Sequence, residues 1–371
     1  MLKILFDHQC FSNQEYGGVS RYYTELIRHL KQNNLAQPEL AIKYSNNQYL
    51  DSLTEVDARL VLSNYQFKGK KLLLDLLNRR NSTKIISKRN YDIFHPTYYH
   101  PYFLNYLGNR PFVITVHDMT HELFPDKMSK WDKSSEHKKL LVEKAKRIIC
   151  VSNNTRNDLI KLLKVEEAKV KVIYHGNSLN YKRDIHFESS LNLPSKYILY
   201  VGSRKYYKNF VLMIKALSDL IRDKNSIKLI CAGGGKFSVD EIKLFSELKI
   251  SDKVIQISVN DKILGALYSN SLCFVFPSLY EGFGMPILEA FSCGSPVICS
   301  NSSSLPEIAG EAAEYFDPKN LQSIRNAVEI VLTDINKREK MISLGFQRLK
   351  KFSWNNSAFQ TFELYKECLN E

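Results

Sequence analysis

Two glutamates stand eight positions apart in the segment YEGFGMPILEA, residues 280–290. Glu281 follows the apolar run LCFVFP (272–277), which predicts a buried strand, and Glu289 falls in a segment that predicts a helix. Pro286 favours the first turn of that helix, and a rise of ~1.5 Å per residue lets both carboxylates line one small pocket. Paired carboxylates can bind the hydroxyls of a sugar-like ligand, although an ordinary strand, turn and helix is the plainer interpretation.

Three cations follow another predicted strand. The segment LYVGSRKYYKNF (199–210) places Arg204, Lys205 and Lys208 between that strand and the next helical pattern. Arginine binds a phosphate as a two-pronged donor and lysine binds it as a point charge, so these side chains can neutralise a pyrophosphate. A solvated basic loop is the alternative that the charge run alone leaves open.

Two further segments place small or polar residues where a helix begins or a strand ends. Gly17 and Gly18 precede a helical pattern, so the backbone there can approach a phosphate and offer it helix N–H groups. His117 ends the apolar run PFVITVH, from which it can reach a ligand at the edge of a sheet. A loop-to-helix junction and a capping histidine are the plainer alternatives. His95 and His100 each precede a proline, a context that favours a structural role.

The elements that must position these residues alternate along almost the whole chain. Short β-branched runs predict strands, and the longer amphipathic stretches between them predict helices, which is typical of parallel sheets with helices on both faces. We predict strands at 2–6, 91–95, 111–117, 147–152, 170–175, 197–202, 227–233, 253–257, 272–277 and 296–300. Helical patterns occupy 19–32, 153–164, 208–222, 260–269, 320–350 and 353–369.

The polar segment 176–196 interrupts this alternation and predicts a linker. A chain of 371 residues exceeds one ordinary core, so we expect two doubly wound α/β domains, residues 1–180 and 181–352. Ligands of such open sheets bind beyond the carboxyl ends of the strands, so the candidate residues would line a cleft between the domains.

Composition narrows the class of protein. Hydrophobic residues make up 44% of the chain and aromatic residues 12%, which indicates a globular protein. No apolar segment approaches the roughly 18 residues of a membrane span, and the first apolar run is too short for a signal peptide. The seven cysteines are scattered and include no CxxC pair, which indicates reduced, buried thiols in a cytosolic protein.

The formal net charge of +13 implies an anionic partner. Basic residues interleave with leucines and isoleucines in 68–90 and recur in 126–147, which favours docking on an anionic membrane surface. A solvated helix surface is the alternative. We expect no nucleic-acid partner, because the chain has no recognition module and its basic residues do not cluster with exposed aromatic residues.

In this order, the segments GGVSRY, TVHD, VIYHG, VGSR and EGFGMPILE resemble the retaining glycosyltransferases of family 4, and the resemblance covers nearly the whole chain. It implies the GT-B fold, in which two Rossmann-like domains face each other across a deep cleft. The first domain would bind the acceptor and the second the nucleotide sugar, with the terminal segment 353–371 packed back on the first. EGFGMPILE matches the family's Glu-x7-Glu motif, which is the most specific part of the resemblance.

The resemblance also implies a role for each candidate residue. Glu281 would bind the hydroxyls of the donor sugar, and Glu289 would bind the ribose of the nucleotide. Arg204 and Lys208 would bind the diphosphate, and His117 would lie near the transferred sugar and the acceptor. Further donor contacts would come from Gly17, Gly18 and the backbone of Gly282, Phe283, Gly284 and Met285.

One departure from the family pattern concerns spacing, because the family's diphosphate-binding Arg and Lys are commonly slightly farther apart than Arg204 and Lys208. Either Lys208 reaches from a shorter loop or Lys205 shares its role; we favour Lys208 because KNF begins the helix, as the family's lysine does.

The sequence has no Asp-x-Asp motif, so we expect no metal and no cofactor, with cations stabilising the departing diphosphate. We expect the acceptor to attack on the face that the diphosphate leaves, without a covalent intermediate.

The resemblance favours GDP-mannose as the donor, because EGFGMP and LFDHQCFSNQEYGGVSRYY are similar to mannosyltransferase-type members. We expect transfer of a hexose to a glycan or a lipid-linked acceptor in the synthesis of a surface polysaccharide such as O-antigen or capsule. The enzyme would be cytoplasmic and peripheral on the inner face of the cytoplasmic membrane. A UDP-sugar or dTDP-sugar donor, and a sugar-phosphate synthase on the same fold, are the alternatives.

Overall fold

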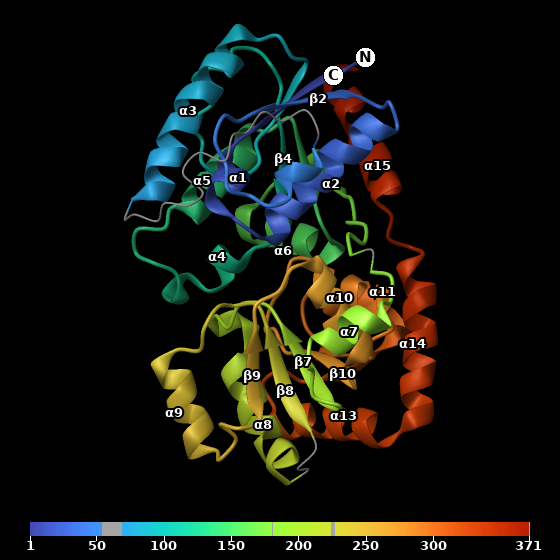
Figure 1. Cartoon of the computed structure of the whole chain (residues 1–371). Helices are drawn as coiled ribbons and strands as arrows, with labels where there is room; N and C mark the ends of the chain where they lie inside the picture. The colour runs from blue at the N-terminus through green and yellow to red at the C-terminus, as the bar shows by residue number, and fades with distance from the viewer. Residues whose placement is uncertain (54–68, 180, 224–226, 371) are drawn as a thin grey trace. The chain divides into compact units, whose positions relative to one another are not determined.

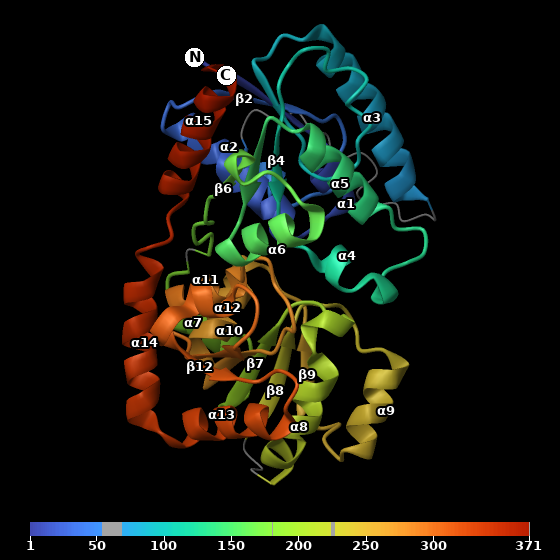
Figure 2. The same cartoon turned by 180° about the vertical axis from the view of Figure 1, so that it is seen from behind.

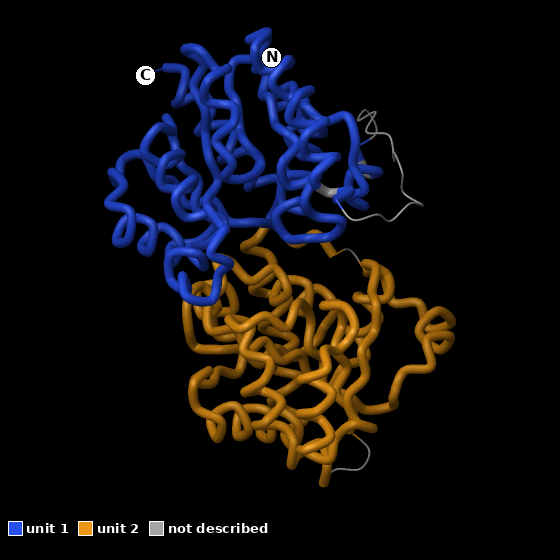
Figure 3. Tube along the Cα trace, turned by 90° about the vertical axis from the view of Figure 1, so that its left-hand side faces the viewer, with its two compact units in different colours: residues 1–176, 353–371 blue, residues 177–352 orange. Residues whose placement is uncertain are grey.

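The computed structural model describes residues 1–53, 69–179, 181–223 and 227–370. The chain divides into two compact units, residues 1–176 with 353–371 and residues 177–352 (Figure 3). The boundary falls between Gly176 and Asn177, four positions before the predicted one. The terminal segment belongs to the first unit, to which helix α15 (Trp354–Asn370) returns.

The second unit contains one parallel sheet of six strands in the order β12-β11-β10-β7-β8-β9. The chain runs from β7 through β8 to β9 and then continues on the other side of β7 with β10. The connections between strands therefore run in opposite directions along the sheet from β7 and from β10. Doubly wound sheets bind their ligands at such a switch point. The strands are β7 Tyr197–Val201, β8 Lys228–Ala232, β9 Val254–Ile257, β10 Cys273–Phe276, β11 Val297–Ser300 and β12 Ala313–Phe316.

Helices cover both faces of this sheet because its strands are apolar on both sides. On one face, Val275 packs in a core with Phe210 of α8 and Val328 of α13. On the other face, Phe274 contacts Tyr268 of α10, with ring centroids 5.3 Å apart. The helices of this unit are α7 Ile185–Ser190, α8 Phe210–Asp223, α9 Val239–Glu247, α10 Asp261–Asn270, α11 Met285–Ser292, α12 Leu305–Ala309, α13 Leu321–Thr333 and α14 Ile335–Leu349 (Figure 1 and Figure 2).

The first unit contains two parallel sheets of three strands, β2-β1-β3 and β4-β5-β6, which a parallel bridge between Phe94 and Phe112 joins. Here the connections run in opposite directions from β1 and from β3, so the first unit has a switch point of its own. The strands are β1 Lys3–Asp7, β2 Gln37–Ala41, β3 Ile93–His95, β4 Val113–Val116, β5 Arg147–Cys150 and β6 Val170–Val172.

All ten predicted strands are present, although several are shorter than predicted, and the sequence-based prediction missed β2 and β12. Both missed strands lie at the edge of their sheets. Their sequences, QPELA and AEYF, have no continuous apolar run, because an edge strand is buried less completely than a central one. Pro38 is tolerated in β2 because an edge strand leaves one row of N–H groups unpaired.

Helix α15 closes the core of the first unit against α2 (Gly18–Gln32), beside which it lies in both Figure 1 and Figure 2. Tyr365 of α15 is buried, and its hydroxyl lies 2.7 Å from Nδ1 of His95. Burial lowers the pKa of His95 to about 3, which fits the structural role that its sequence context favours. The other helices of this unit are α1 Gln9–Asn13, α3 Lys70–Lys88, α4 Thr120–Leu123, α5 Ser134–Lys144 and α6 Asn153–Leu163.

Some predicted segments differ in detail. The helical pattern 320–350 is two helices, because the side chain of Asp334 caps α14 by accepting a hydrogen bond from the N–H of Lys337. The polar segment 176–196 contains the short helix α7, which Asp184 caps in the same way. Positions 68, 180 and 371 of the predicted segments lie outside the described residues.

Two compositional predictions also bear on the fold. Among the described residues, no helix is both long enough and apolar enough to span a membrane. The seven cysteines are unpaired, and all of them except Cys293 are buried, as their apolar contexts predicted. Burial raises the pKa of the Cys293 thiol to about 11 and that of the Cys273 thiol to about 12.

Candidate active site

Glu281 lies beyond the carboxyl end of β10, next to β7 at the switch point of the second unit. Its Oε1 accepts hydrogen bonds from Ser278 Oγ at 2.5 Å and from Lys208 Nζ at 2.6 Å. Its N–H donates to Ser303 Oγ at 3.0 Å. The strand order thus brings a carboxylate into contact with an ammonium group 73 positions away in the sequence.

Lys208 ends a single turn of 3-10 helix, Tyr206–Lys208, between β7 and α8. Its Nζ lies 5.6 Å from the ring centre of Phe276, the last residue of β10. Lys205, the other lysine considered for the diphosphate, is exposed at the start of the turn. Lys208 is therefore the one of the two that the structure places against Glu281.

Arg204, which the sequence suggested as a ligand of the diphosphate, contacts residues of α9 and of the loop before it. Its Nε donates to Glu241 Oε1 at 2.6 Å, and its Nη2 donates to the carbonyl of Lys236 at 2.8 Å. The guanidinium carbon lies 4.8 Å from the ring centre of Phe237. The guanidinium is thus already paired with a carboxylate on α9, so a phosphate would have to compete with Glu241 for it.

The turn EGFGMP is held by serines that follow β11. Ser304 Oγ donates to the carbonyl of Glu281 at 2.9 Å and to that of Phe283 at 2.8 Å. Gly284 adopts a left-handed backbone with φ of +110°, directly before α11 begins at Met285. The first N–H groups of a helix have no acceptor within it, so α11 directs N–H donors and the positive end of its dipole to this edge of the sheet.

The sequence-based interpretation missed Ser303 and Ser304. The signal that could have found them is the run SNSSS (300–304), which directly follows the predicted strand 296–300. Because parallel strands end at one edge of the sheet, polar residues after β11 lie near those after β10.

Glu289 lies in the second turn of α11 and is 8% exposed. Its Oε2 accepts a hydrogen bond from the hydroxyl of Tyr268 at 3.2 Å. The two carboxylates of the motif therefore have separate partners in the same unit. That separation suits the distinct sugar and ribose roles predicted for them, which stay predictions.

His117 directly follows β4 in the first unit. Its N–H donates to the hydroxyl of Tyr99 at 3.0 Å, and its ring contacts the rings of Tyr22 and Tyr23, with centroids 5.1 and 5.7 Å away. Its Nε2 is buried and has no hydrogen-bond partner in the part of the chain that the structure describes. Burial lowers the pKa of His117 to about 4, although the charge of Asp118 opposes the shift. The imidazole is therefore neutral near neutral pH.

Gly17 and Gly18 stand at the start of α2, where the sequence suggested a phosphate. A Cβ at Gly17 would lie 2.3 Å from Gln14 Oε1, and the same oxygen accepts a hydrogen bond from the N–H of Ser20 at 3.0 Å. The Gln14 amide thus occupies the N-terminal end of α2. A donor phosphate would have to displace it, so the role of these glycines stays a prediction.

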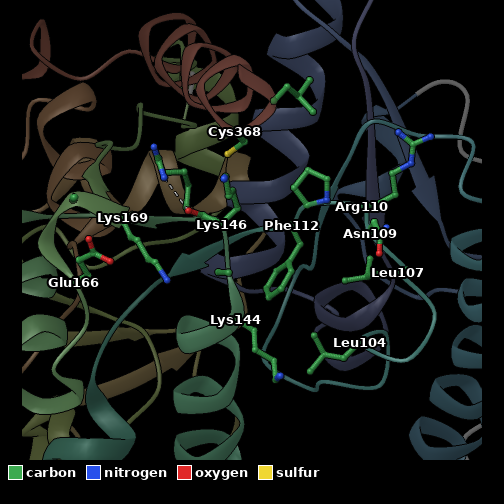
Figure 4. Close-up of a pocket in the computed structure, with 16 residues that line it drawn as sticks. Leu104, Leu107, Asn109, Arg110, Phe112, Lys144, Lys146, Glu166, Lys169 and Cys368 are labelled. Atoms are coloured by element: carbon green, nitrogen blue, oxygen red, sulfur yellow. Dashed lines mark hydrogen bonds between the residues drawn. The ribbon is translucent and has the colours of Figure 1, made fainter. Parts of the chain in front are cut away.

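A hollow of about 1000 Å³ lies at the opposite edge of the first unit's sheet (Figure 4). Pro111, Arg147 and Lys169, which stand at the amino ends of β4, β5 and β6, line it. Open parallel sheets bind their ligands at the carboxyl ends of the strands, so this hollow is not the candidate active site.

Two family models match the chain, Glycosyltransferase Family 4 over residues 16–180 and Glycosyl transferases group 1 over residues 181–348. Among curated relatives, O-antigen chain mannosyltransferase B of Escherichia coli is 29% identical over 94% of this chain and 96% of its own length. O-antigen chain mannosyltransferase RfbU of Salmonella typhimurium is 29% identical over 58% of this chain and 59% of its own length.

Solved structures resemble the whole chain. HepE of Anabaena, in complex with UDP and glucose, has a TM-score of 0.76 at 18% identity and covers 98% of this chain and 99% of its own. WaaG, a glycosyltransferase involved in lipopolysaccharide biosynthesis, has a TM-score of 0.72 at 13% identity, with coverage of 98% and 99%. At these identities the likeness shows the fold, which is the predicted GT-B fold with two Rossmann-like α/β domains. The chain belongs to glycosyltransferase family 4.

Proposed function

We propose that this glycosyltransferase moves a hexose, with retention of configuration, from a nucleotide sugar to a glycan or a lipid-linked acceptor of a surface polysaccharide. The observation that carries the proposal is the contact between Lys208 and Glu281 at the switch point between β7 and β10. A carboxylate there can bind sugar hydroxyls, and an ammonium group can bind a phosphate. The two groups are adjacent, as the sugar and the phosphate are adjacent in the donor.

Mannose from GDP-mannose is the donor that we favour. The relatives from Escherichia coli and Salmonella typhimurium described above are named as mannosyltransferases, and the sequence resembles that group. HepE was solved with UDP and glucose, so a UDP-sugar is the alternative, and a dTDP-sugar would satisfy the same contacts. Glu281 would contact sugar hydroxyls, which do not identify the base.

The proposed reaction breaks the bond between the anomeric carbon and the diphosphate oxygen. It forms a bond from that carbon to an acceptor hydroxyl on the same face, and the leaving phosphate takes the proton of that hydroxyl. Lys208 and the N–H groups of α11 would stabilise the charge that develops on the diphosphate, together with Arg204 once it exchanges Glu241 for phosphate. Neither glutamate of the motif acts as a nucleophile, and His117 would orient a hydroxyl through Nε2.

We propose that no metal and no cofactor takes part, because side-chain cations and helix N–H groups supply the positive charge that a metal would otherwise supply. Dialysis of the purified chain against a chelator is then expected to leave turnover unchanged. A loss of turnover that added Mg²⁺ restores would contradict this part of the proposal.

A donor screen tests the function. The purified chain is incubated with GDP-mannose, UDP-glucose, UDP-N-acetylglucosamine and dTDP-sugars, and the release of nucleoside diphosphate is measured. We expect release of GDP from GDP-mannose, and a product whose new glycosidic bond keeps the donor's anomeric configuration by NMR. An inverted product would contradict the retaining mechanism. Release of nucleoside diphosphate only from a UDP-sugar would show that the donor is that UDP-sugar and not GDP-mannose.

A sugar-phosphate synthase is the second candidate function. Sucrose-phosphate synthase of Thermosynechococcus elongatus shares the fold, with a TM-score of 0.74 at 18% identity. The same screen separates the two functions when hexose phosphates and uncharged glycosides are offered as acceptors. Transfer only to the phosphorylated acceptors would favour the synthase.

We further propose that α3 docks the first unit on the inner face of the cytoplasmic membrane, where a lipid-linked acceptor would be held. Four of its leucines are exposed: Leu72 (64%), Leu73 (41%), Leu76 (52%) and Leu77 (41%). Arg80 and Lys84 on the same helix are also exposed. Exposed apolar side chains bordered by cations are typical of a helix that lies in the interface of an anionic membrane.

The second basic segment, 126–147, supports docking less than its sequence suggested. Lys138 within it is fully buried, and its Nζ donates to Glu122 Oε2 and to the carbonyl of Asp118, each at 2.8 Å. That lysine holds the loop after His117 and is not available to a membrane. Lys130, Lys133 and Lys139 are exposed and stay available.

A further inference from the structure

A second group of polar residues gathers at the switch point of the first unit, between β1 and β3. His8 and Gln9 follow β1, and residues 98–100 follow β3. Together with residues of α3 and of the loop before α5, they line a cavity of about 330 Å³. That volume is near the lower end of the range of roughly 300–1,000 Å³ for small-molecule sites.

Hydrogen bonds to Asp7 fix the floor of this cavity. Asp7 is fully buried and accepts hydrogen bonds from the N–H of Thr97 at 2.8 Å, from Gln9 Nε2 at 2.7 Å and from the Tyr102 hydroxyl at 3.0 Å. Gln9 Oε1 in turn accepts from the N–H of His100 at 2.8 Å. The polar side chains around the cavity are therefore held in place before a ligand arrives, which lowers the entropy cost of binding.

Two side chains that line the cavity, His8 and Arg79, contact the carboxylate of Asp75. His8 is fully buried; its Nδ1 lies 2.9 Å from Ser82 Oγ, and its Nε2 lies 3.4 Å from Asp75 Oδ1. Arg79 Nε makes no hydrogen bond among the described residues, although Arg79 Nη2 donates to Asp75 Oδ2 at 2.8 Å. Buried polar atoms are nearly always hydrogen-bonded, so Arg79 Nε indicates a polar ligand or water beside the Arg79 side chain.

An exposed aromatic side chain borders the same cavity. Trp131 is 90% exposed, so its indole face is accessible to a ligand at this cavity. A pyranose ring has an apolar C–H face and a rim of hydroxyls. The face matches an indole ring, and the rim matches the carboxylate of Asp75 and the guanidinium of Arg79.

The charges around the cavity favour an uncharged ligand. Asp75 and Asp132 balance Arg79 and Lys133. The hollow in Figure 4 differs in this respect, because its lining has one acidic residue against five basic ones and suits an anion: Glu166 against Arg110, Lys144, Lys146, Arg147 and Lys169. A phosphorylated ligand would therefore find little excess positive charge at the switch point.

Tyr99 connects the cavity to the predicted reaction site. It lines the cavity, and its hydroxyl accepts the hydrogen bond from the N–H of His117. We infer that the cavity binds the acceptor as an uncharged pyranoside, with its ring on Trp131 and its hydroxyls held by Asp75, Arg79 and His8. The inference rests on the proposed function, because it assigns the acceptor of that same reaction.

Tryptophan fluorescence tests binding directly, because the chain has two tryptophans and Trp354 is only 4% exposed. The full chain is titrated with methyl glycosides and α-linked disaccharides of mannose, glucose, galactose and N-acetylglucosamine. We expect a saturable blue shift with at least one probe, because a sugar ring shields Trp131 from water. The shift should disappear in Trp131→Phe, and its persistence there, or its absence from the unmodified chain, would overturn the inference.

Transfer kinetics test the same residues without relying on fluorescence. Asp75→Asn is expected to raise the KM for the acceptor ~10–100-fold, as the loss of a hydrogen bond to a charged group does. Trp131→Ala is expected to raise it ~10-fold, because it removes the aromatic face on which the sugar ring would lie. The KM for the nucleotide sugar should not change. Trp131→Phe keeps an aromatic face, so it should retain most of the affinity for the acceptor that Trp131→Ala loses. Glu143→Gln, at an exposed carboxylate of α5, is the matched control.

The two experiments separate the inference from the function on which it rests. If no nucleotide sugar is turned over, the proposed function fails, but the fluorescence titration still decides whether the cavity binds a pyranoside. If turnover is normal and both Trp131→Ala and Asp75→Asn leave the acceptor KM unchanged, only the assignment of the cavity is overturned.

Discussion

Lys208 and Glu281 carry most of the proposed chemistry at the scale of single residues. Their side chains are 18% and 14% exposed, and each compensates the charge of the other at 2.6 Å. Partly buried charges that are paired avoid most of the cost of desolvation. A donor would divide the pair, since its phosphate takes the ammonium group and its sugar hydroxyls take the carboxylate.

We expect Glu281→Gln and Lys208→Met each to lower kcat/KM ~10²–10³-fold, because each removes a group that stabilises the transition state. The double variant should be little worse than the poorer single variant, because both groups hold one ligand. Steady-state kinetics with the donor identified in the screen measure all three. Glu247→Gln, at an exposed carboxylate of α9, is the control, and full activity in Glu281→Gln would refute the site assignment.

His117 permits a prediction about pH. Its pKa of about 4 keeps the ring neutral in the ordinary working range, so protonation of His117 should not shape the activity profile above about pH 5. We expect His117→Ala to lower kcat ~100-fold, as loss of a positioned group does, while the shape of the profile stays the same. An acidic limb near pH ~6.5, the ordinary pKa of histidine, that disappears in the variant would show that His117 titrates there.

At the scale of elements, the start of α11 decides where the motif residues point. The chain must turn sharply between β10 and α11, and it does so through the left-handed conformation of Gly284. An L-residue in that conformation brings its Cβ close to the following carbonyl, at a cost of roughly 1–2 kcal/mol. The glycine is therefore part of the turn that places Glu281 on Ser278 and Lys208.

Gly284→Ala should destabilise the second unit by more than the backbone strain alone, because the new Cβ would lie 3.1 Å from Leu305 Cδ2. Gly235→Ala is the matched control, since Gly235 also has a left-handed φ, +76°, and no atom lies within 4 Å of its Cβ position. Chemical denaturation of the two variants measures the difference. Equal losses of stability would contradict a role for the Leu305 contact.

The α3 helix gives a second prediction at this scale. Leu72→Gln combined with Leu76→Gln should weaken binding to anionic vesicles at least ~10-fold, because each leucine loses apolar area that the membrane would bury. Val239→Gln combined with Ile242→Gln is the control, because these side chains are as exposed (82% and 54%) but lie on α9 of the second unit. Vesicle flotation measures both, and equal loss in the two variants would argue against docking through α3.

At the scale of the whole molecule, the two units differ in their histidines. Of the nine histidines, eight lie in residues 1–176 and one, His186, lies in the second unit. Burial lowers the pKa of His95 to about 3, that of His117 to about 4 and that of His175 well below the ordinary value. A histidine that is neutral when folded takes up its proton only on unfolding, so acid destabilises the first unit selectively.

The sign of this effect follows from the lowered pKa values. Between pH ~6.5 and pH ~4 the unfolded chain binds protons that the folded chain does not. The free energy of unfolding therefore decreases as the pH is lowered, by up to ~1.4 kcal/mol per pH unit for each such histidine. In Trp131→Phe the remaining tryptophan, Trp354, is packed on His175 with ring centroids 5.7 Å apart and reports on the first unit. Denaturation of Trp131→Phe at several pH values should therefore give a free energy of unfolding that depends more steeply on pH than that of the same chain carrying His95→Gln as well. His186→Gln, at an exposed position, is the control.

Local patterns in the sequence were sufficient for most elements. The central strands are continuous apolar runs because helices bury both of their faces, and such runs are visible in the sequence. Edge strands β2 and β12 lack that signature, and Asp334 divides a helical pattern whose periodicity continues across it. Those features depend on burial and capping contacts, which periodicity does not report.

The sequence by itself determined the two-domain parallel architecture, the family and the motif residues, because each depends on residue types and spacings within short segments. Only the tertiary structure decided that Lys208 binds Glu281, that Glu241 holds Arg204 and that Ser304 anchors the motif turn. It also placed Trp131 beside Asp75 and Arg79 at one cavity. The physical reason is strand order: residues far apart in the chain meet at one sheet edge according to which strands are neighbours, and local sequence patterns do not encode that order.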